Sequence, residues 1–416
     1  MLNEIMLVPI PIFSKSREVI GYRFSYRIGN ALLEEGKVFS GVTALPFFDF
    51  INKVGLEALT YNKMVFVPVT DVQLAVALEY ECKVDRAMIA LTLDKSNGLS
   101  DSNLRRIRHF KEQGFKLAFY NVYNIMELEA FMPYTDYVFC DHKSDILMPI
   151  IRYVRSRELP TTVIAINIES INEFDRALFF GVELMEGQFY KYPAHLRNEH
   201  VSPLQFNYIQ LLEYVNRADF DFNEFSKIIL RDTALTLQFL RLVNSSAARM
   251  SKITSLRHAA AMLGQNDIRR WIRTAVTNML SRDKPGELTR ISLLRAKFCE
   301  NIAPSFQMAV HVENLFLTGL LSVLDAIMDM SMEQALDMIT VPDQVRGALM
   351  GDDGEFSRVL QFVLMYEQGN WVEVSRIALV NRVEVYAIRA AYVDALLWYG
   401  HIINMAVEAD AQDDPQ

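Results

Sequence analysis

The hydrophobic periodicity of the sequence changes near residue 200, and this change limits what the chain can fold into. Before that point, short runs rich in β-branched and aromatic residues alternate with charged amphipathic stretches. After it, apolar residues recur at the three- and four-residue spacing of an α-helix. The pattern predicts an α/β domain at 1–195, a linker at 196–203 and an all-helical domain at 204–416.

Short apolar runs in the first half are typical of β-strands. They lie at 5–13, 19–27, 64–70, 87–93, 116–121, 137–141, 161–167 and 184–193. Strands that alternate with helical stretches usually pair in parallel and are covered by helices on both faces. The runs therefore predict a (β/α)8 barrel of the TIM type, with an open doubly wound sheet as the alternative. No glycine-rich nucleotide fingerprint follows any run, which argues against dinucleotide and P-loop chemistry.

Charge and cysteine content narrow the function classes. The chain has 42 basic and 51 acidic residues, a net charge of −9, so it lacks the basic excess of a nucleic-acid binder. Its cysteines, Cys82, Cys140 and Cys299, are far apart and match no paired metal-binding spacing. No signal peptide or membrane-spanning run is apparent. We expect a cytoplasmic protein that binds neither nucleic acid nor membrane.

Three phrases at strand positions carry a family resemblance. They are REVIGYRFSYR at 17–27, VIAINIES at 163–170 and GVELMEGQFYKYP at 181–193. Their order and spacing resemble the EAL domain of cyclic-di-GMP phosphodiesterases. The resemblance covers most of residues 1–195. It implies a barrel whose strand-end carboxylates hold two Mg²⁺ or Mn²⁺ ions, which activate a water against a phosphodiester.

The chain departs from the EAL pattern at nearly every functional position. The substituted positions are Arg23, Pro68, Leu91, Tyr120, Asn121, Phe139, Ile166 and Glu186. Arg23 brings a positive charge to the place where a cation should bind. Asp94, Asp141 and Glu169 are the acids that remain. We therefore expect no metal, no cofactor, no catalytic residue and no enzymatic activity.

The same positions leave open a ligand site without hydrolysis. Arg23 and Arg27 could meet the phosphates of cyclic-di-GMP, because a guanidinium fork suits that geometry. Asp141 and Glu186 complete this candidate set. In the alternative interpretation, Arg23 is a surface or salt-bridge residue in a filled, repurposed barrel.

The stretch from 229 to 272 resembles the HDOD domain, a helical relative of HD phosphohydrolases that lacks their metal ligands. The residues that match its motifs are Asp232, Arg241, Asn244, Ser245, His258, Gly264 and Trp271. We interpret them as structural or partner-binding residues. No histidine is followed by aspartate, so the HD metal pair is absent. A helix-turn-helix around Gly264 is disfavoured by the acidic charge.

The order of the two resemblances is that of EAL–HDOD signalling proteins, also called YuxH-like. It implies a non-catalytic bacterial signalling or scaffold protein that acts through protein–protein interactions in cyclic-di-GMP signalling. A receptor that binds cyclic-di-GMP without hydrolysis is the alternative, and a residual phosphodiesterase is the third. The expected partners are signalling proteins, with cyclic-di-GMP as a candidate ligand. A homodimer is expected by analogy with the family.

Overall fold

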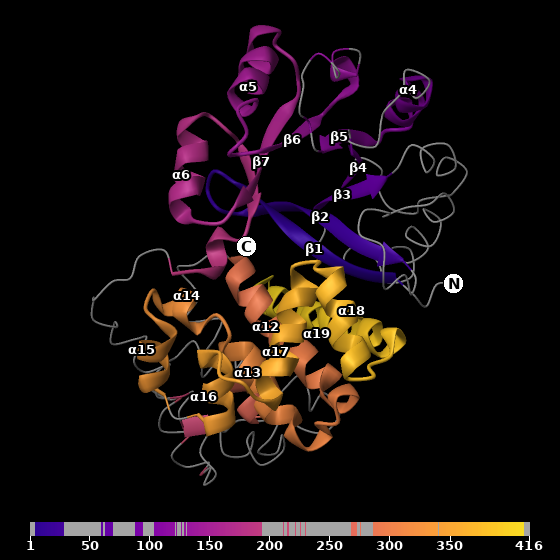
Figure 1. The fold of residues 1–416 in the computed structure, drawn as a ribbon. Helices are drawn as coiled ribbons and strands as arrows, with labels where there is room; N and C mark the ends of the chain where they lie inside the picture. Colours follow the sequence, from indigo (N-terminus) through magenta and orange to yellow (C-terminus); the bar gives the residue numbers. More distant parts are fainter. Residues whose placement is uncertain are drawn as a thin grey trace. The chain divides into compact units, whose positions relative to one another are not determined.

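The computed structural model describes most of the barrel strands and the C-terminal helices. The described residues are 5–28, 63–69, 88–94, 104–120, 131–193, 268–272, 286–339 and 341–411, with some single positions between them. The chain divides into two compact units (Figure 1). The first contains residues 1–192, 301–309 and 361–400, and the second contains 193–300, 310–360 and 401–416. The predicted linker at 196–203 lies outside the described residues, so the domain boundary stays a prediction.

A closed barrel forms the centre of the first unit. Its strands follow one another in chain order: β1 (Ile5–Ser14), β2 (Val19–Ile28), β3 (Met64–Val69), β4 (Ile89–Asp94), β5 (Lys116–Tyr120), β6 (Tyr137–Asp141), β7 (Thr162–Ile168) and β8 (Leu184–Gly187). The predicted eight-stranded barrel is thus confirmed. The strand direction differs from the predicted parallel pairing at β1, which runs antiparallel to both β2 and β8. Only four residues join β1 to β2, which is too short for the crossover that a parallel pair requires.

Helices cover the outside of the strands, and side chains fill the inside. The helices are α4 (Leu104–Glu112), α5 (Leu147–Ser156) and α6 (Ile171–Phe179) (Figure 1). Ser170 begins α6, since its side chain accepts a hydrogen bond from the Glu173 backbone N–H. The buried interior cluster consists of Ile12, Phe66, Ala90, Ala118, Phe139, Ile164 and Ile166. The barrel is therefore a packed core and not a pore.

The last predicted strand ends earlier than its apolar run suggests. The run continues to residue 193, but β8 stops at Gly187 and a short 3₁₀ helix, η8 (Phe189–Lys191), follows. A Cβ on Gly187 would lie 1.9 Å from the Ile168 carbonyl oxygen, so only glycine allows this approach of β8 to β7. The Gln188 N–H then donates to the same oxygen over 2.8 Å, which turns the chain out of the sheet.

C-terminal helices also belong to the first unit. They are the end of α17 (Glu355–Glu367), all of α18 (Trp371–Val380) and most of α19 (Val385–Ala411). The Tyr366 hydroxyl accepts a hydrogen bond from the Leu7 N–H over 3.3 Å and donates one to the Leu7 carbonyl over 3.2 Å. Lys191 forms an ion pair with Glu367. These contacts join the end of α17 to β1 and to the segment after β8.

The second unit is helical, as predicted. Its described helices are most of α12 (Gly286–Ile302), α13 (Val312–Leu321), α14 (Leu324–Met328), α15 (Met332–Asp337), α16 (Asp343–Met350) and the start of α17, together with η10 (Ala309–His311) at its edge. Another 3₁₀ helix, η9 (Ala303–Phe306), lies in the first unit, as η7 (Met132–Tyr134) does. The sequence pattern did not single out α16 or α18. In the described part of the chain, no helix combines the length and apolar character needed to cross a bilayer.

Candidate functional site

A bidentate ion pair lies inside the barrel, between β2 and β8. Arg23 Nε and Nη2 each donate to one carboxylate oxygen of Glu186 over 2.7 Å. The two side chains are 15% and 6% exposed, so water screens the pair only weakly. This fork-to-fork geometry is the strongest arrangement of an arginine with a carboxylate. β1 lies between β2 and β8 in the sheet, and the pair therefore spans the inner surface across it.

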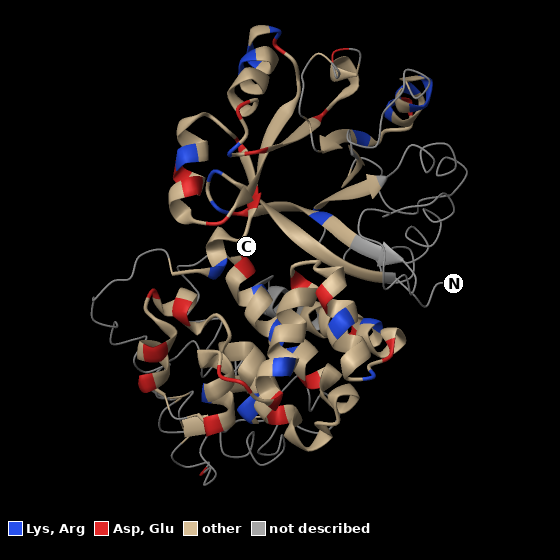
Figure 2. Cartoon of the chain, viewed as in Figure 1, with Lys and Arg blue, Asp and Glu red and all other residues tan. Residues whose placement is uncertain are grey.

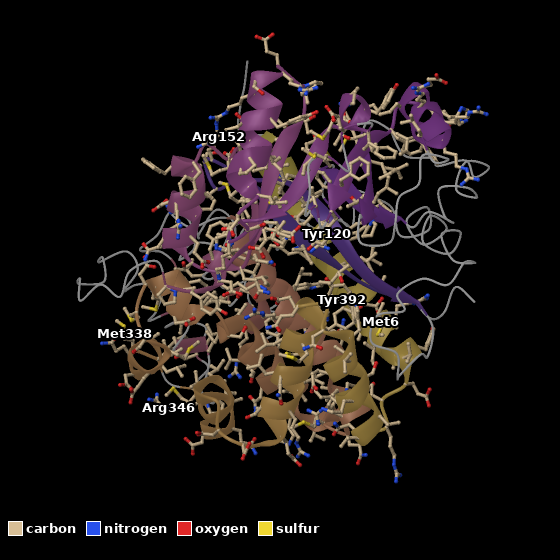
Figure 3. All side chains as sticks on the ribbon, turned by 45° about the horizontal axis from the view of Figure 1, so that its top comes forward. Met6, Tyr120, Arg152, Met338, Arg346 and Tyr392 are labelled. Atoms are coloured by element: carbon tan, nitrogen blue, oxygen red, sulfur yellow. The ribbon has the colours of Figure 1, made fainter. Side chains whose placement is uncertain are left out.

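Aromatic rings pack around this ion pair. The Arg23 guanidinium carbon lies 4.8 Å from the centre of the Tyr120 ring, at the end of β5. The Tyr120 and Phe139 ring centres are 5.5 Å apart, and Phe139 and Phe66 are 5.3 Å apart. Figure 3 shows Tyr120 among the strands. Burial would lower the pKa of Arg23, but Glu186 and Tyr120 outweigh it and raise the pKa above its ordinary value.

A second polar cluster lies where β6 and β7 end. Asp141 accepts hydrogen bonds from the Lys143 backbone N–H over 2.8 Å and from the Asn167 side-chain amide over 2.7 Å. Asn167 has φ of 62°, a left-handed conformation that is uncommon for residues other than glycine. Its hydrogen bond to Asp141 offsets part of that strain. The cluster thus fixes the turn that follows β6 and joins it to the irregular end of β7.

Glu173 joins this cluster from α6. It accepts hydrogen bonds from the Glu169 N–H over 2.8 Å, and it lies 3.1 Å from Lys143 Nζ and 3.3 Å from His142 Nε2. His142 Nδ1 lies 3.0 Å from the Ile166 carbonyl oxygen, so the ring is held between β7 and α6. Burial would raise the pKa of Glu173, but the hydrogen bonds from the Glu169 N–H and Lys143, together with the charge and hydrogen bond of His142, lower it to about 2.

Replacing Glu173 with glutamine should remove a stabilising effect that depends on acidity. A carboxylate whose pKa is lowered in the folded state stabilises the fold above its unfolded pKa, and loses that effect as the pH falls toward the folded pKa. Here the window runs from the ordinary value of 4.5 down to about 2. We expect E173Q to unfold more easily than wild type at pH 6, with the difference shrinking below pH ~4. Thermal unfolding at several pH values measures this, and a difference that stays constant down to pH ~2 would contradict it.

The structure brings some of the predicted residues together and separates others. Arg23, Glu186, Tyr120 and Phe139 share one cluster, and Ile166 belongs to the same interior core. Leu91 does not reach this interior. It is buried on the other face of β4 from Ala90, since successive strand residues point to opposite faces. Its assignment to the strand 4 position of the EAL pattern stays a prediction.

The other predicted positions lie in β2, in β3, in a short helical stretch or outside the described residues. Pro68 lies in β3 on the face of Phe66, and Arg27 lies in β2 opposite Met6, although the Arg27 side chain is outside the described residues. The other predicted residues that lie outside them are Asn121, Asp232, Arg241, Asn244, Ser245, His258 and Gly264. Trp271 is half-buried in a short helical stretch.

The sequence alone missed several polar residues of the site. Thr92 is 3% exposed on the inner face of β4, and strand alternation from Ala90 could have identified it. The pairing of His142, Asn167 and Glu173 had no sequence signal, because it depends on how β6, β7 and α6 meet.

The described acids do not form a metal centre. In the part of the chain that the structure describes, no three side chains of His, Cys, Asp or Glu gather closely enough to hold an ion. Both Asp141 oxygens are engaged by Lys143 and Asn167, and Arg23 occupies Glu186. The described side chains therefore do not fit the two-metal centre that an EAL enzyme implies.

One solved structure with a similar chain path is the EAL enzyme Bd1971 with cAMP and cyclic-di-GMP bound. It is 14% identical, with a TM-score of 0.36, and the match covers 45% of this chain and 61% of that chain. This chain therefore spans less than two thirds of that protein.

Two curated proteins are similar along nearly the whole chain. One is the cyclic di-GMP phosphodiesterase CdgJ of Vibrio cholerae serotype O1, 27% identical over 93% of this chain and 90% of that protein. The other is the uncharacterized protein YuxH of Bacillus subtilis strain 168, 27% identical over 95% of this chain and 98% of that protein. The match to CdgJ overturns the expectation that the chain is not an enzyme. That expectation rested on the substituted barrel positions and the absent HD metal pair, whereas a protein named as a phosphodiesterase aligns across both halves.

The helical half has its own match. Residues 202–341 match the family model of the HDOD domain, which confirms that part of the sequence interpretation. The chain thus combines a closed eight-stranded barrel with an HDOD domain, and it is similar over most of its length to CdgJ and YuxH.

Proposed function

We propose that this chain is a signal-transduction protein linked to cyclic-di-GMP, and that it acts through contacts with protein partners. The name of CdgJ supports the link to the dinucleotide, and the HDOD match at 202–341 supports a signalling role for the helical half. In this proposal the barrel is a degenerate EAL domain that senses the dinucleotide, and the helical half contacts the partner.

The observation that carries the proposal is the bidentate ion pair between Arg23 and Glu186. Arg23 binds Glu186 through the Nε and Nη2 edge of its guanidinium, an edge that also suits a phosphate. A phosphate that takes this edge must displace the Glu186 carboxylate. Such an exchange gives the barrel two alternative arrangements, and a ligand that binds one of them more tightly shifts the population. This is the property that a signal-sensing domain needs.

A cyclic-di-GMP phosphodiesterase is the second candidate function. The specific observation in its favour is the 27% identity to CdgJ over 93% of the chain. The described residues include no fitting set of metal ligands, so no hydrolytic step is derived from them. An assay of the reaction itself decides this candidate.

The full-length protein should be titrated with cyclic-di-GMP in a calorimeter and incubated with it in Mg²⁺ or Mn²⁺. We expect saturable heat at tens of micromolar, and a loss of that heat in R23M. Arg152 is an exposed arginine on α5, so R152M is the matched control and should bind as wild type does. Absence of heat and of product would contradict the link to cyclic-di-GMP. Linear product formation that EDTA abolishes would establish the phosphodiesterase function.

The partner half of the proposal needs its own measurement. The immobilised full-length protein should retain a discrete protein from an extract of its source cells, and added cyclic-di-GMP should change the amount retained. Retention of no protein under either condition would contradict a function through protein contacts. Sedimentation of the purified chain tests the predicted homodimer.

A further inference from the structure

Helix α4 concentrates positive charge on a chain that is acidic as a whole. Four basic residues of this helix, Arg105, Arg106, Arg108 and Lys111, together with Lys116 at the start of β5, are what we call the α4 basic patch. The nearby acids are Asp101, Glu112 and Asp136, which leaves 5 − 3 = +2 locally against −9 for the chain. Figure 2 shows the blue of Lys and Arg dominating α4.

The packing of α4 fixes which face carries these charges. Ile107 and Phe110 are buried, and the Phe110 ring centre lies 5.8 Å from that of Phe115. The apolar face is thereby used against the barrel. Arg105 and Arg108 are exposed on the remaining face, with the Arg108 guanidinium 5.2 Å from the centre of the Tyr134 ring. The helix thus presents arginines outward.

Two exposed arginines of the patch have no acidic partner within the described residues. Lys111 and Lys116 share one acid, Asp136, at 2.5 Å and 3.6 Å. Among the described residues, Arg105 and Arg108 form no ion pair. Arg105, Arg108 and Lys111 follow one another at three-residue spacing, so like charges are neighbours on the helix surface and repel each other. Glu112, four residues after Arg108, offsets part of this repulsion, and both arginines stay exposed to a partner.

We propose that the α4 basic patch binds an acidic segment of a protein partner. This inference rests on the proposed function and names the surface through which the barrel contacts that partner. An arginine side chain binds a carboxylate through two parallel hydrogen bonds. The Tyr134 ring orients Arg108 before a partner binds, which lowers the entropic cost of binding. Charge complementarity with an acidic segment would also relieve the repulsion along the helix.

Two other anionic surfaces fit the patch less well. A helix that binds a membrane needs an apolar face directed at the lipid, and the apolar face of α4 packs on the barrel. A nucleic acid would meet the long-range repulsion of a chain with a net charge of −9. A short acidic protein segment contacts the patch alone and avoids most of that repulsion.

The test measures binding of the full-length protein to three probes. The first is a fluorescein-labelled 20-residue peptide of alternating Glu and Gly, the second is vesicles of phosphatidylcholine with phosphatidylglycerol, and the third is a 20-base-pair DNA duplex. The test variant is R105E/R108E. The control is R152E/R176E, which makes the same charge change on exposed helical arginines of the same unit, one of them also over an aromatic ring, Phe180.

We expect the peptide to bind wild type at low salt, and R105E/R108E to weaken this binding by about tenfold or more. R152E/R176E should stay within about twofold of wild type. Equal weakening in both variants, or no peptide binding to wild type, would overturn the inference. So would binding to vesicles or DNA that depends on α4 and exceeds binding to the peptide. If wild type captures a partner and R105E/R108E captures it equally well, this inference is overturned and the proposed function stands. If wild type captures no partner, the proposed function itself is contradicted.

Discussion

The variant E186Q is expected to destabilise the barrel by about 3–5 kcal/mol, because it leaves the buried Arg23 guanidinium without its counter-charge. The Glu186 side chain is 6% exposed and Arg23 is 15% exposed, so little water can replace the lost carboxylate. A guanidinium keeps its proton in proteins even where it is buried, so Arg23 cannot escape this cost by losing its charge. Local unfolding should show the effect most directly, and hydrogen exchange of peptides covering β2 and β8 measures it.

The matched control is E183Q, one strand position before β8. Glu183 also pairs with a cation, Lys15, over 3.3 Å, but the two side chains are 57% and 62% exposed. Its removal should cost about 0–1 kcal/mol. The double variant R23M/E186L removes both charges and should recover most of the stability that E186Q loses. Equal exchange rates in E186Q and E183Q would show that the interior pair does not hold β2 to β8.

The strands could be predicted from the sequence because their signal is local. Alternation and β-branched composition identify each run without knowledge of its neighbours, and all eight runs became strands. The end of β8 could not be predicted in this way. It depends on the backbone of β7 lying against Gly187, which is a long-range contact.

The candidate site shows the same division. The sequence singled out both Arg23 and Glu186 as departures from a family pattern, yet it could not pair them. They are 163 positions apart, and they meet only because the barrel closes through β1. The helical period after residue 203 likewise predicts helices but not what they pack against. Nothing local indicates that Tyr366 belongs with β1.

Substituting Tyr366 by phenylalanine is expected to loosen β1 by about 1–3 kcal/mol, because it leaves two buried backbone groups without partners. The Tyr366 side chain is among the most buried of the chain, and its hydroxyl binds both the N–H and the carbonyl of Leu7. Phenylalanine keeps the ring contacts with Trp371 and Tyr392, at 5.3 Å and 4.7 Å, and removes only the hydroxyl. Exchange of β1 amides should rise roughly five- to hundredfold. The control is Y386F, which alters a tyrosine that is 60% exposed, and the exchange of β1 amides should not change in this variant.

The sequence of β1 explains why the Tyr366 hydroxyl has a large effect on the stability of this strand. β8 pairs with β1 only at Ile12–Ser14, so the earlier part of β1 has an edge that no described strand covers. Pro9 and Pro11 occupy alternate positions from Leu7, and proline has no N–H, so this edge offers few donors to another chain. Tyr366 satisfies the donor that remains at Leu7. We therefore expect Y366F to lose stability without self-association, as checked by sedimentation. Self-association of Y366F would show that the prolines do not protect the edge, whereas unchanged exchange in β1 would show that α17 does not hold it.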